Sequence, residues 1–188
     1  YDLWRNHLLQ LKQGFKLFKD DVSFRKYKKA TIANVDLTNN DFSKVVSVQS
    51  MFEGDSMLTD VYGLDTISTY NVTNFMNMFK GCTSLVTDAW NLLDTSKATC
   101  TANMFDGVQI PGELNLGLDL TYVTAIEGMF SNNSALTKLD LSNTHLNQRL
   151  VGMDELVKND TNLTSISFRG LNLQGVVSAT DTFEGCNN

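Results

Sequence analysis

Apolar pairs, most of them Met-Phe, recur along the chain at intervals of 25 to 27 residues. The second residue of each pair, which we call the anchor, is Phe52, Phe79, Phe105, Phe130, Val157 or Phe183. The positions four and seven before each anchor are mostly apolar, which is the spacing of one helix face. Two positions after each anchor stands Gly or Asn, the residues that most readily adopt the left-handed backbone that ends a helix. We therefore predict a helix in every repeat, ending with positive φ at Gly54, Gly81, Gly107, Asn132, Asn159 and Gly185.

A strand is predicted after each helix, because the ninth and eleventh positions past the anchor alternate with polar ones. The inward positions are Val35, Leu37, Val61, Gly63, Asp88, Trp90, Leu114, Leu116, Leu139, Leu141, Ile166 and Phe168. Units of this length fall within the leucine-rich-repeat range of about 20 to 29 residues, in which stacked units bury what single units cannot. We predict an α/β fold: a right-handed leucine-rich-repeat solenoid of about six strand-helix units.

The first 30 residues differ from the repeats in pattern and in charge. An apolar stripe from Trp4 to Val22 predicts an amphipathic helix over residues 3–22. Residues 1–30 sum to +5, whereas the remaining residues sum to −11. We interpret residues 1–30 as a helical cap and 31–188 as the repeat domain; a partner-binding or membrane-surface helix is the alternative for the cap. Because a solenoid needs a polar terminal cap, we expect the native protein to continue beyond Asn188.

Composition and charge exclude several classes of function. A net charge of −6 and a pI near 4.8 argue against nucleic-acid and anionic-membrane binding. No apolar stretch approaches the ~20 residues of a membrane span. The two His and three Cys form no metal or nucleophile pattern, so we predict neither an enzyme nor a cofactor.

The cysteines are predicted to be free thiols. Cys82 and Cys186 occupy the same repeat position four units apart, which at one strand spacing per unit separates them by ~19 Å. A disulfide needs Cα atoms within ~7 Å, so these two cannot pair. A pair between Cys82 and Cys100 stays open on the unit count alone.

The repeat resembles the BspA-like leucine-rich-repeat surface proteins over about residues 31–188. Val72, Met78-Phe79, Cys82 and Leu85 carry the resemblance in one unit. Val123, Met129-Phe130, Leu136 and Leu139-Asp140-Leu141-Ser142 carry it in another. The resemblance implies a cell-surface or secreted protein, with an adhesive, protein-binding role outside the cell.

The outward positions of the predicted strands are the eighth and tenth after each anchor. We predict that a protein partner binds on this concave face, at Asp36, Asp60, Tyr62, Glu113, Asn115, Lys138 and Asp140. The excess of carboxylates favours a basic partner, and Tyr62 is the aromatic anchor that interfaces favour. The alternatives are a solvated sheet on a structural spacer or assembly subunit without a discrete ligand, and an accessory domain of an enzyme.

Overall fold

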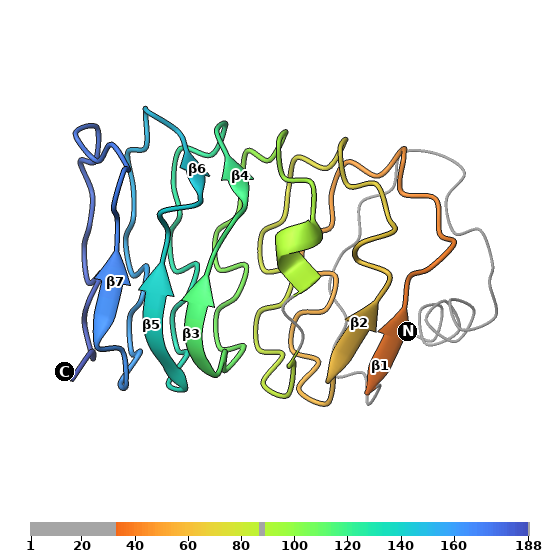
Figure 1. Ribbon diagram of the computed structural model, residues 1–188, viewed down its shortest axis with the longest axis horizontal. Helices are drawn as coiled ribbons and strands as arrows, with labels where there is room; N and C mark the ends of the chain where they lie inside the picture. Colours follow the sequence, from red (N-terminus) through yellow and green to blue (C-terminus); the bar gives the residue numbers. More distant parts are fainter. Residues whose placement is uncertain (1–32, 87–88, 188) are drawn as a thin grey trace.

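The structure is a computed structural model that describes residues 33–86 and 89–187. The chain winds into a β-solenoid of about five turns, which we call coils, stacked along the long axis in Figure 1. The predicted helix over 3–22 and the cap over 1–30 lie outside the described residues. The division into a cap and a repeat domain therefore stays a prediction.

Short parallel strands line one wall of the solenoid. They are β1 (Asn34–Asp36), β2 (Asp60–Tyr62), β3 (Gly112–Asn115), β5 (Leu136–Asp140) and β7 (Ser165–Ser167). β1 pairs with β2, and β3, β5 and β7 form a second sheet in that order. Between the two sheets, the 3-10 helix η1 (Ala89–Leu92) takes the place of a strand (Figure 1). A further parallel pair, β4 (Asp119–Leu120) and β6 (His145–Leu146), lies beyond the carboxyl ends of β3 and β5.

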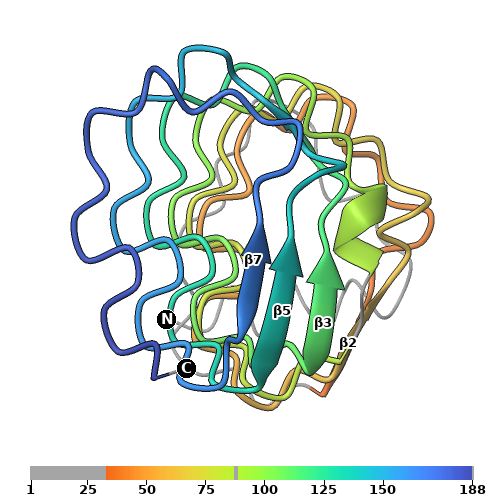
Figure 2. The ribbon, with the colours of Figure 1, turned by 60° about the vertical axis from the view of Figure 1, so that its left-hand side comes forward.

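The predicted α/β leucine-rich-repeat solenoid of strand-helix units is wrong, because the segments around the anchors are not helical. Their N–H groups bond to the next coil: Phe52 N donates to the Met78 carbonyl at 2.9 Å, and Gly54 N to the Lys80 carbonyl at 2.7 Å. In an α-helix each N–H would bond four residues back along its own segment. The wall opposite the strands is therefore a stack of extended turns, seen without arrows in Figure 2.

Left-handed residues explain why no helix forms. The six predicted positions two after each anchor all have positive φ, from 61° to 77°, so that part of the prediction is confirmed. A second set with positive φ stands two before each anchor: Ser50, Asn77, Asn103, Gly128, Glu155 and Asp181. Two left-handed residues four positions apart cannot belong to one right-handed helix. The prediction failed because polar residues such as Ser50 and Glu155 do not signal positive φ.

The helix-like spacing of apolar residues has another origin. Val45 N bonds to the Phe42 carbonyl at 2.9 Å, and Met51 N to the Val48 carbonyl at 3.1 Å. Such turns span three residues and bring every third side chain back to the interior. Successive turns thus imitate the three- and four-residue spacing of a helix face.

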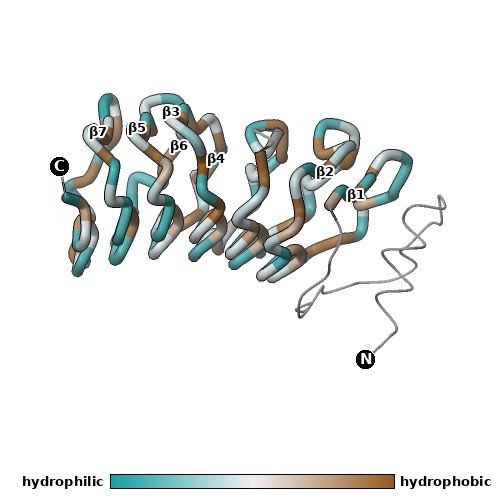
Figure 3. The backbone as a smooth tube through the Cα atoms, turned by 90° about the horizontal axis from the view of Figure 1, so that it is seen from below, coloured by the Kyte–Doolittle hydropathy of each residue, from teal (hydrophilic) through white to brown (hydrophobic). Residues whose placement is uncertain are grey.

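The core is built from columns of equivalent side chains. The anchors Phe52, Phe79, Phe105 and Phe130 stack with centroids 5.6, 5.9 and 5.6 Å apart. Trp90, predicted in a strand, points inward from η1, with its ring centroid 5.3 Å from that of Phe105. Figure 3 shows the coils as successive rungs, with apolar and polar stretches alternating along each. Dense packing of identical rings fixes the spacing between coils.

Side chains of Asp and Asn hold the corners of the coils. Asp36 accepts from the Thr38 N–H at 2.9 Å, and Asp94 accepts from the Ser96 N–H at 3.0 Å. This contact to the backbone two residues on is the turn that Asp and Asn favour. At Gly63, with φ +83°, a Cβ would lie 2.5 Å from Thr38 N, so only Gly fits there.

Candidate binding surface

The strand face consists of the outward side chains of β1, β2, β3, β5 and β7. The structure places all seven predicted site residues on it, none of them buried. The register sets Asn34 beside Asp60 and Asp36 beside Tyr62, and in the second sheet Glu113 beside Lys138 and Asn115 beside Asp140. Because η1 separates the two sheets, the seven residues form two groups instead of one groove.

The β1–β2 group is acidic and carries an exposed aromatic ring. Tyr62 is 51% exposed. The hydroxyl and the N–H of Thr38 donate to Asp36 at 2.6 and 2.9 Å, which lowers the pKa of that carboxyl. Asp60 accepts from the Val61 N–H at 2.8 Å. No ion pair to Asp36 or Asp60 is formed by a cation among the described residues.

The β3–β5 group is nearly charge-balanced. Lys138 forms an ion pair with Glu113 across the two strands. Asn115 accepts from Asn143 Nδ2 at 3.0 Å. The pKa of Asp140 is lowered, first by the Ser142 N–H, which donates to it at 2.9 Å. Two of the predicted carboxylates, Asp36 and Asp140, thus also hold turns of their own chain.

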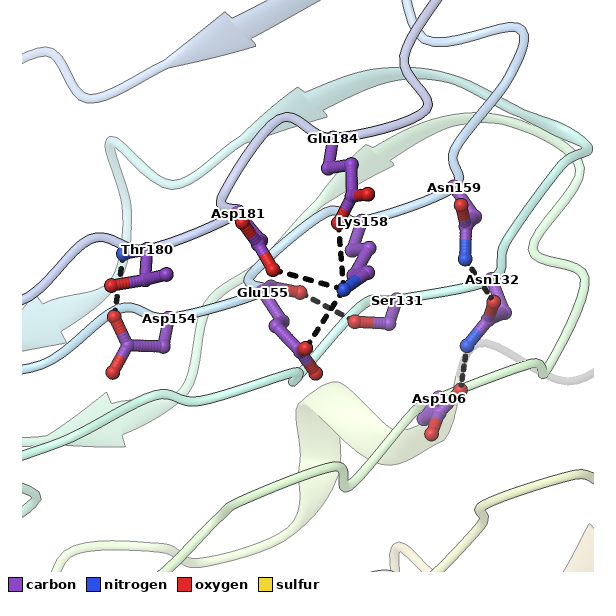
Figure 4. Close-up of polar contacts among 10 residues, drawn as sticks. All are labelled: Asp106, Ser131, Asn132, Asp154, Glu155, Lys158, Asn159, Thr180, Asp181 and Glu184. Atoms are coloured by element: carbon purple, nitrogen blue, oxygen red, sulfur yellow. Dashed lines mark hydrogen bonds and ion pairs between the residues drawn. The ribbon is translucent and has the colours of Figure 1, made fainter.

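A cluster that the sequence reasoning missed surrounds Lys158 on the opposite wall (Figure 4). Its Nζ lies 2.7 Å from Glu184, 2.9 Å from Glu155 and 3.1 Å from Asp181. These carboxylates, Glu184 first, raise the pKa of Lys158 above its ordinary value. The signal was available: acidic residues stand two before the anchor in two successive repeats, beside Lys and Glu one after it.

Polar side chains also link successive coils on that wall. Asn159 Nδ2 donates to Asn132 at 3.0 Å, and Asn132 Nδ2 donates to Asp106 at 2.7 Å (Figure 4). Asp106 in turn pairs with Lys80 at 2.7 Å. These groups satisfy one another between coils, which favours a structural role for this wall.

Two buried carboxyls occupy the position three after the anchor. Asp160 is fully buried, and its Oδ1 accepts from the Asn133 N–H at 2.7 Å. Its Oδ2 has no hydrogen-bond partner in the described part of the chain. Burial raises the pKa of Asp160 to about 8 and that of Asp55, in the first coil, to about 6.

The cysteines are free, as predicted. The Cys82 thiol donates to the Phe52 carbonyl at 3.0 Å, and burial raises its pKa to about 12. The Cys186 thiol donates to the Val157 carbonyl at 3.2 Å. A thiol with so high a pKa is a poor nucleophile, so Cys82 acts as a core residue.

Residues 33–86 and 89–187 contain no group of three or more His, Cys, Asp or Glu arranged to hold a metal ion. Over the same residues, no helix is long and apolar enough to cross a membrane.

The repeats match a family model described as "Mycoplasma protein of unknown function, DUF285", over residues 21–143 and again over 93–188. The chain belongs to the DUF285 family. Residues 93–143 are matched twice, as expected when one model fits a repeat array in two registers. DUF285 is a repeat family associated with surface proteins and has no established function. No curated protein and no solved structure matches the chain.

The DUF285 match agrees with the predicted repeat solenoid and with the surface-protein side of the resemblance. The leucine-rich-repeat part of that resemblance is not what the coils show, since they contain short strands and turns without the predicted helices.

Proposed function

We propose that this DUF285 chain is a protein-binding module of a cell-surface or secreted protein, and that it binds a basic protein partner through the β1–β2 part of the strand face. The observation that carries the proposal is the exposed Tyr62 ring between carboxylates that no described cation neutralises. The association of the family with surface proteins supports the location. The proposal includes no catalysis and no cofactor.

The chemistry of this group suits a protein interface. Tyr supplies a large, rigid contact area with a polar tip, and aromatic residues are enriched among the residues that dominate binding energy. Asp36 and Asp60 lie on paired strands, so binding would not have to order them. The hydrogen bonds from Thr38 keep Asp36 ionised at mildly acidic pH, which favours Lys and Arg on the partner.

The β3–β5 group contributes less in this proposal. Glu113 and Lys138 already neutralise each other, so a charged partner gains little from either. Asn115 and Asn143 can supply hydrogen bonds at the rim of the interface.

A structural spacer is the second candidate. It is supported by the opposite wall, where Asn132, Asn159 and Asp106 bond to one another between coils. A wall of this kind stiffens the array without offering free groups to a ligand.

Two variants of equal composition test the binding proposal. Asp60→Asn with Tyr62→Ser alters the β1–β2 group, whereas Glu127→Gln with Tyr122→Ser removes one carboxylate and one exposed Tyr elsewhere. Asp36 and Asp140 stay unchanged because they hold turns. Lysozyme and cytochrome c serve as basic probe proteins, measured by biolayer interferometry at low and high salt.

We expect the first variant to lose about tenfold or more in affinity and the second to lose little, since hot-spot residues carry most of the energy. Higher salt should weaken binding of the unchanged protein. Equal losses in the two variants would show binding through net charge alone, and would overturn the assignment to Tyr62 and its neighbours.

A further inference from the structure

The last coil leaves its apolar side chains uncovered. Phe183 is 51% exposed, whereas the anchors of the four aromatic coils are at most 2% exposed. We call the uncovered side of this coil the tail face, formed by Ile166, Phe168, Leu173, Val176, Phe183 and Cys186, which are half-buried or exposed. Their equivalents in the inner coils are almost all buried. The tail face is thus one half of the coil–coil interface that repeats through the chain.

The backbone at this end is also open. β7 pairs only with β5, and its Ser167 carbonyl accepts from Leu141 N at 3.0 Å. Since backbone groups alternate in direction along a strand, the N–H and C=O of Ile166 point away from β5. Beside them lies a hollow of about 220 Å³, lined by Leu163, Thr164, Ser165, Ile166, Phe183 and Cys186. An edge with unpaired backbone groups and an apolar floor is suited to accept another strand.

The other end of the solenoid does not offer the complementary surface. Val35, Val48 and Phe52 in the first coil are at most 3% exposed. A second copy therefore cannot add its first coil to the tail face through free apolar side chains. The remaining self-complementary arrangement joins two tail faces about a two-fold axis, which closes as a dimer.

We propose that the tail face binds the tail face of a second copy of this chain, with the two β7 strands antiparallel and each Phe183 covered by the partner. The occupant follows from continuity with the coil–coil interface, which already joins β5 to β7 through paired backbone and apolar columns. This surface is distinct from the strand face, so the dimer does not depend on the proposed partner binding.

Charge gives the dimer a signature opposite to that of the strand face. Asp181 and Glu184 of the last coil are 46% and 56% exposed and share one cation, Lys158. Two tail faces therefore bring together an excess of carboxylates. Salt should strengthen this association by screening the repulsion, whereas it should weaken binding of a basic partner.

The test is sedimentation equilibrium of the 188-residue chain at micromolar to 100 μM concentration, chosen to span the ~μM–100 μM range of weak self-association. We expect a concentration-dependent mass up to twice 20.9 kDa, rising with salt. Phe183→Asp should raise the dissociation constant at least tenfold by placing a charge in the contact. Tyr122→Asp, on a side chain 63% exposed elsewhere, is the matched control and should leave it within about twofold.

Ile166→Pro provides a second variant, because it removes an N–H that points to the open edge. Circular dichroism and urea titration check that each variant is folded. Dimerisation lost in both tail variants and kept in the control supports the proposal. A monomer at every concentration, a dimer indifferent to Phe183→Asp, or open-ended growth would overturn it.

Discussion

The first four aromatic coils and the last two coils share one backbone but are held together by different chemistry. From Phe52 to Phe130 the anchors form a continuous aromatic stack. From Val157 on the stack is interrupted, and the coils are joined by the Lys158 cluster and by Asn159. Both regions keep the two left-handed residues around the anchor and the bonds between coils at alternate N–H groups. The common feature of the repeat is therefore its backbone geometry, and different side chains can fill its columns.

Removing one ring from the stack should have the largest effect on stability. Phe105 packs against Phe79, Phe130 and Trp90, so Phe105→Ala leaves a cavity bounded by rings on three sides. We expect a loss of about 3–5 kcal/mol in the free energy of unfolding. Val157→Ala, which removes fewer atoms where the stack is interrupted, should cost clearly less. Urea denaturation of both variants measures the difference, and equal losses would mean that the rings add nothing beyond ordinary burial.

The position two after the anchor separates backbone geometry from side-chain chemistry. It is Gly81 in the second coil, with φ +74°, and Asn132 in the fourth, with φ +61°. Gly81→Val should cost about 1–3 kcal/mol, because a β-branched residue is strained in the left-handed region. Gly81→Asn is the matched variant and should cost less, since Asn tolerates that region and a Cβ there would lie 3.5 Å from Gly54 Cα. Thermal unfolding compares the two; a tolerated Val would argue against a backbone constraint.

Stability should fall as pH rises, and more in the last coils than in the first. Burial raises the pKa of Asp160 to about 8 and that of Asp55 to about 6 in the folded chain, above the value of about 4 in the unfolded chain. The folded state therefore binds more protons, and its stability decreases from pH 4 up to about 6 for Asp55 and about 8 for Asp160.

Urea midpoints measured from pH 4 to pH 9 test this pH dependence. Asp160→Asn should flatten the profile between pH 6 and 8, and Asp55→Asn should flatten it only below pH 6. A profile unchanged by Asp160→Asn would contradict the assignment of the titration to this carboxyl.

The smallest effect is expected at the Lys158 cluster. Lys158→Met removes the cation shared by Glu155, Asp181 and Glu184, but all these side chains are in contact with solvent. Exposed ion pairs contribute little, so the urea midpoint should shift far less than in Phe105→Ala. The shift should shrink at high salt, because screening weakens both the lost attraction and the new repulsion among the carboxylates. A loss that is independent of salt would indicate packing of the lysine stem instead of charge.

Much of this architecture followed from the repeat itself. The period, the solenoid, the inward residues such as Leu114 and Leu139, and the six left-handed positions after the anchors were all predictable, because each depends on local residue type and spacing. The outward position of Tyr62 and Asp60 followed from the same alternation. Their role in binding stays a prediction.

The tertiary structure alone decided how the anchor segments fold and how the strand face is divided. A spacing of three and four fits both a helix and a series of tight turns, and the choice depends on hydrogen bonds to the next coil, such as Phe52 N to the Met78 carbonyl. The place of Trp90 in η1, which separates the two sheets, likewise depends on the room between Phe79 and Phe105. Periodicity records which side chains face inward, whereas backbone partners 24 to 27 residues away determine which local conformation brings them there.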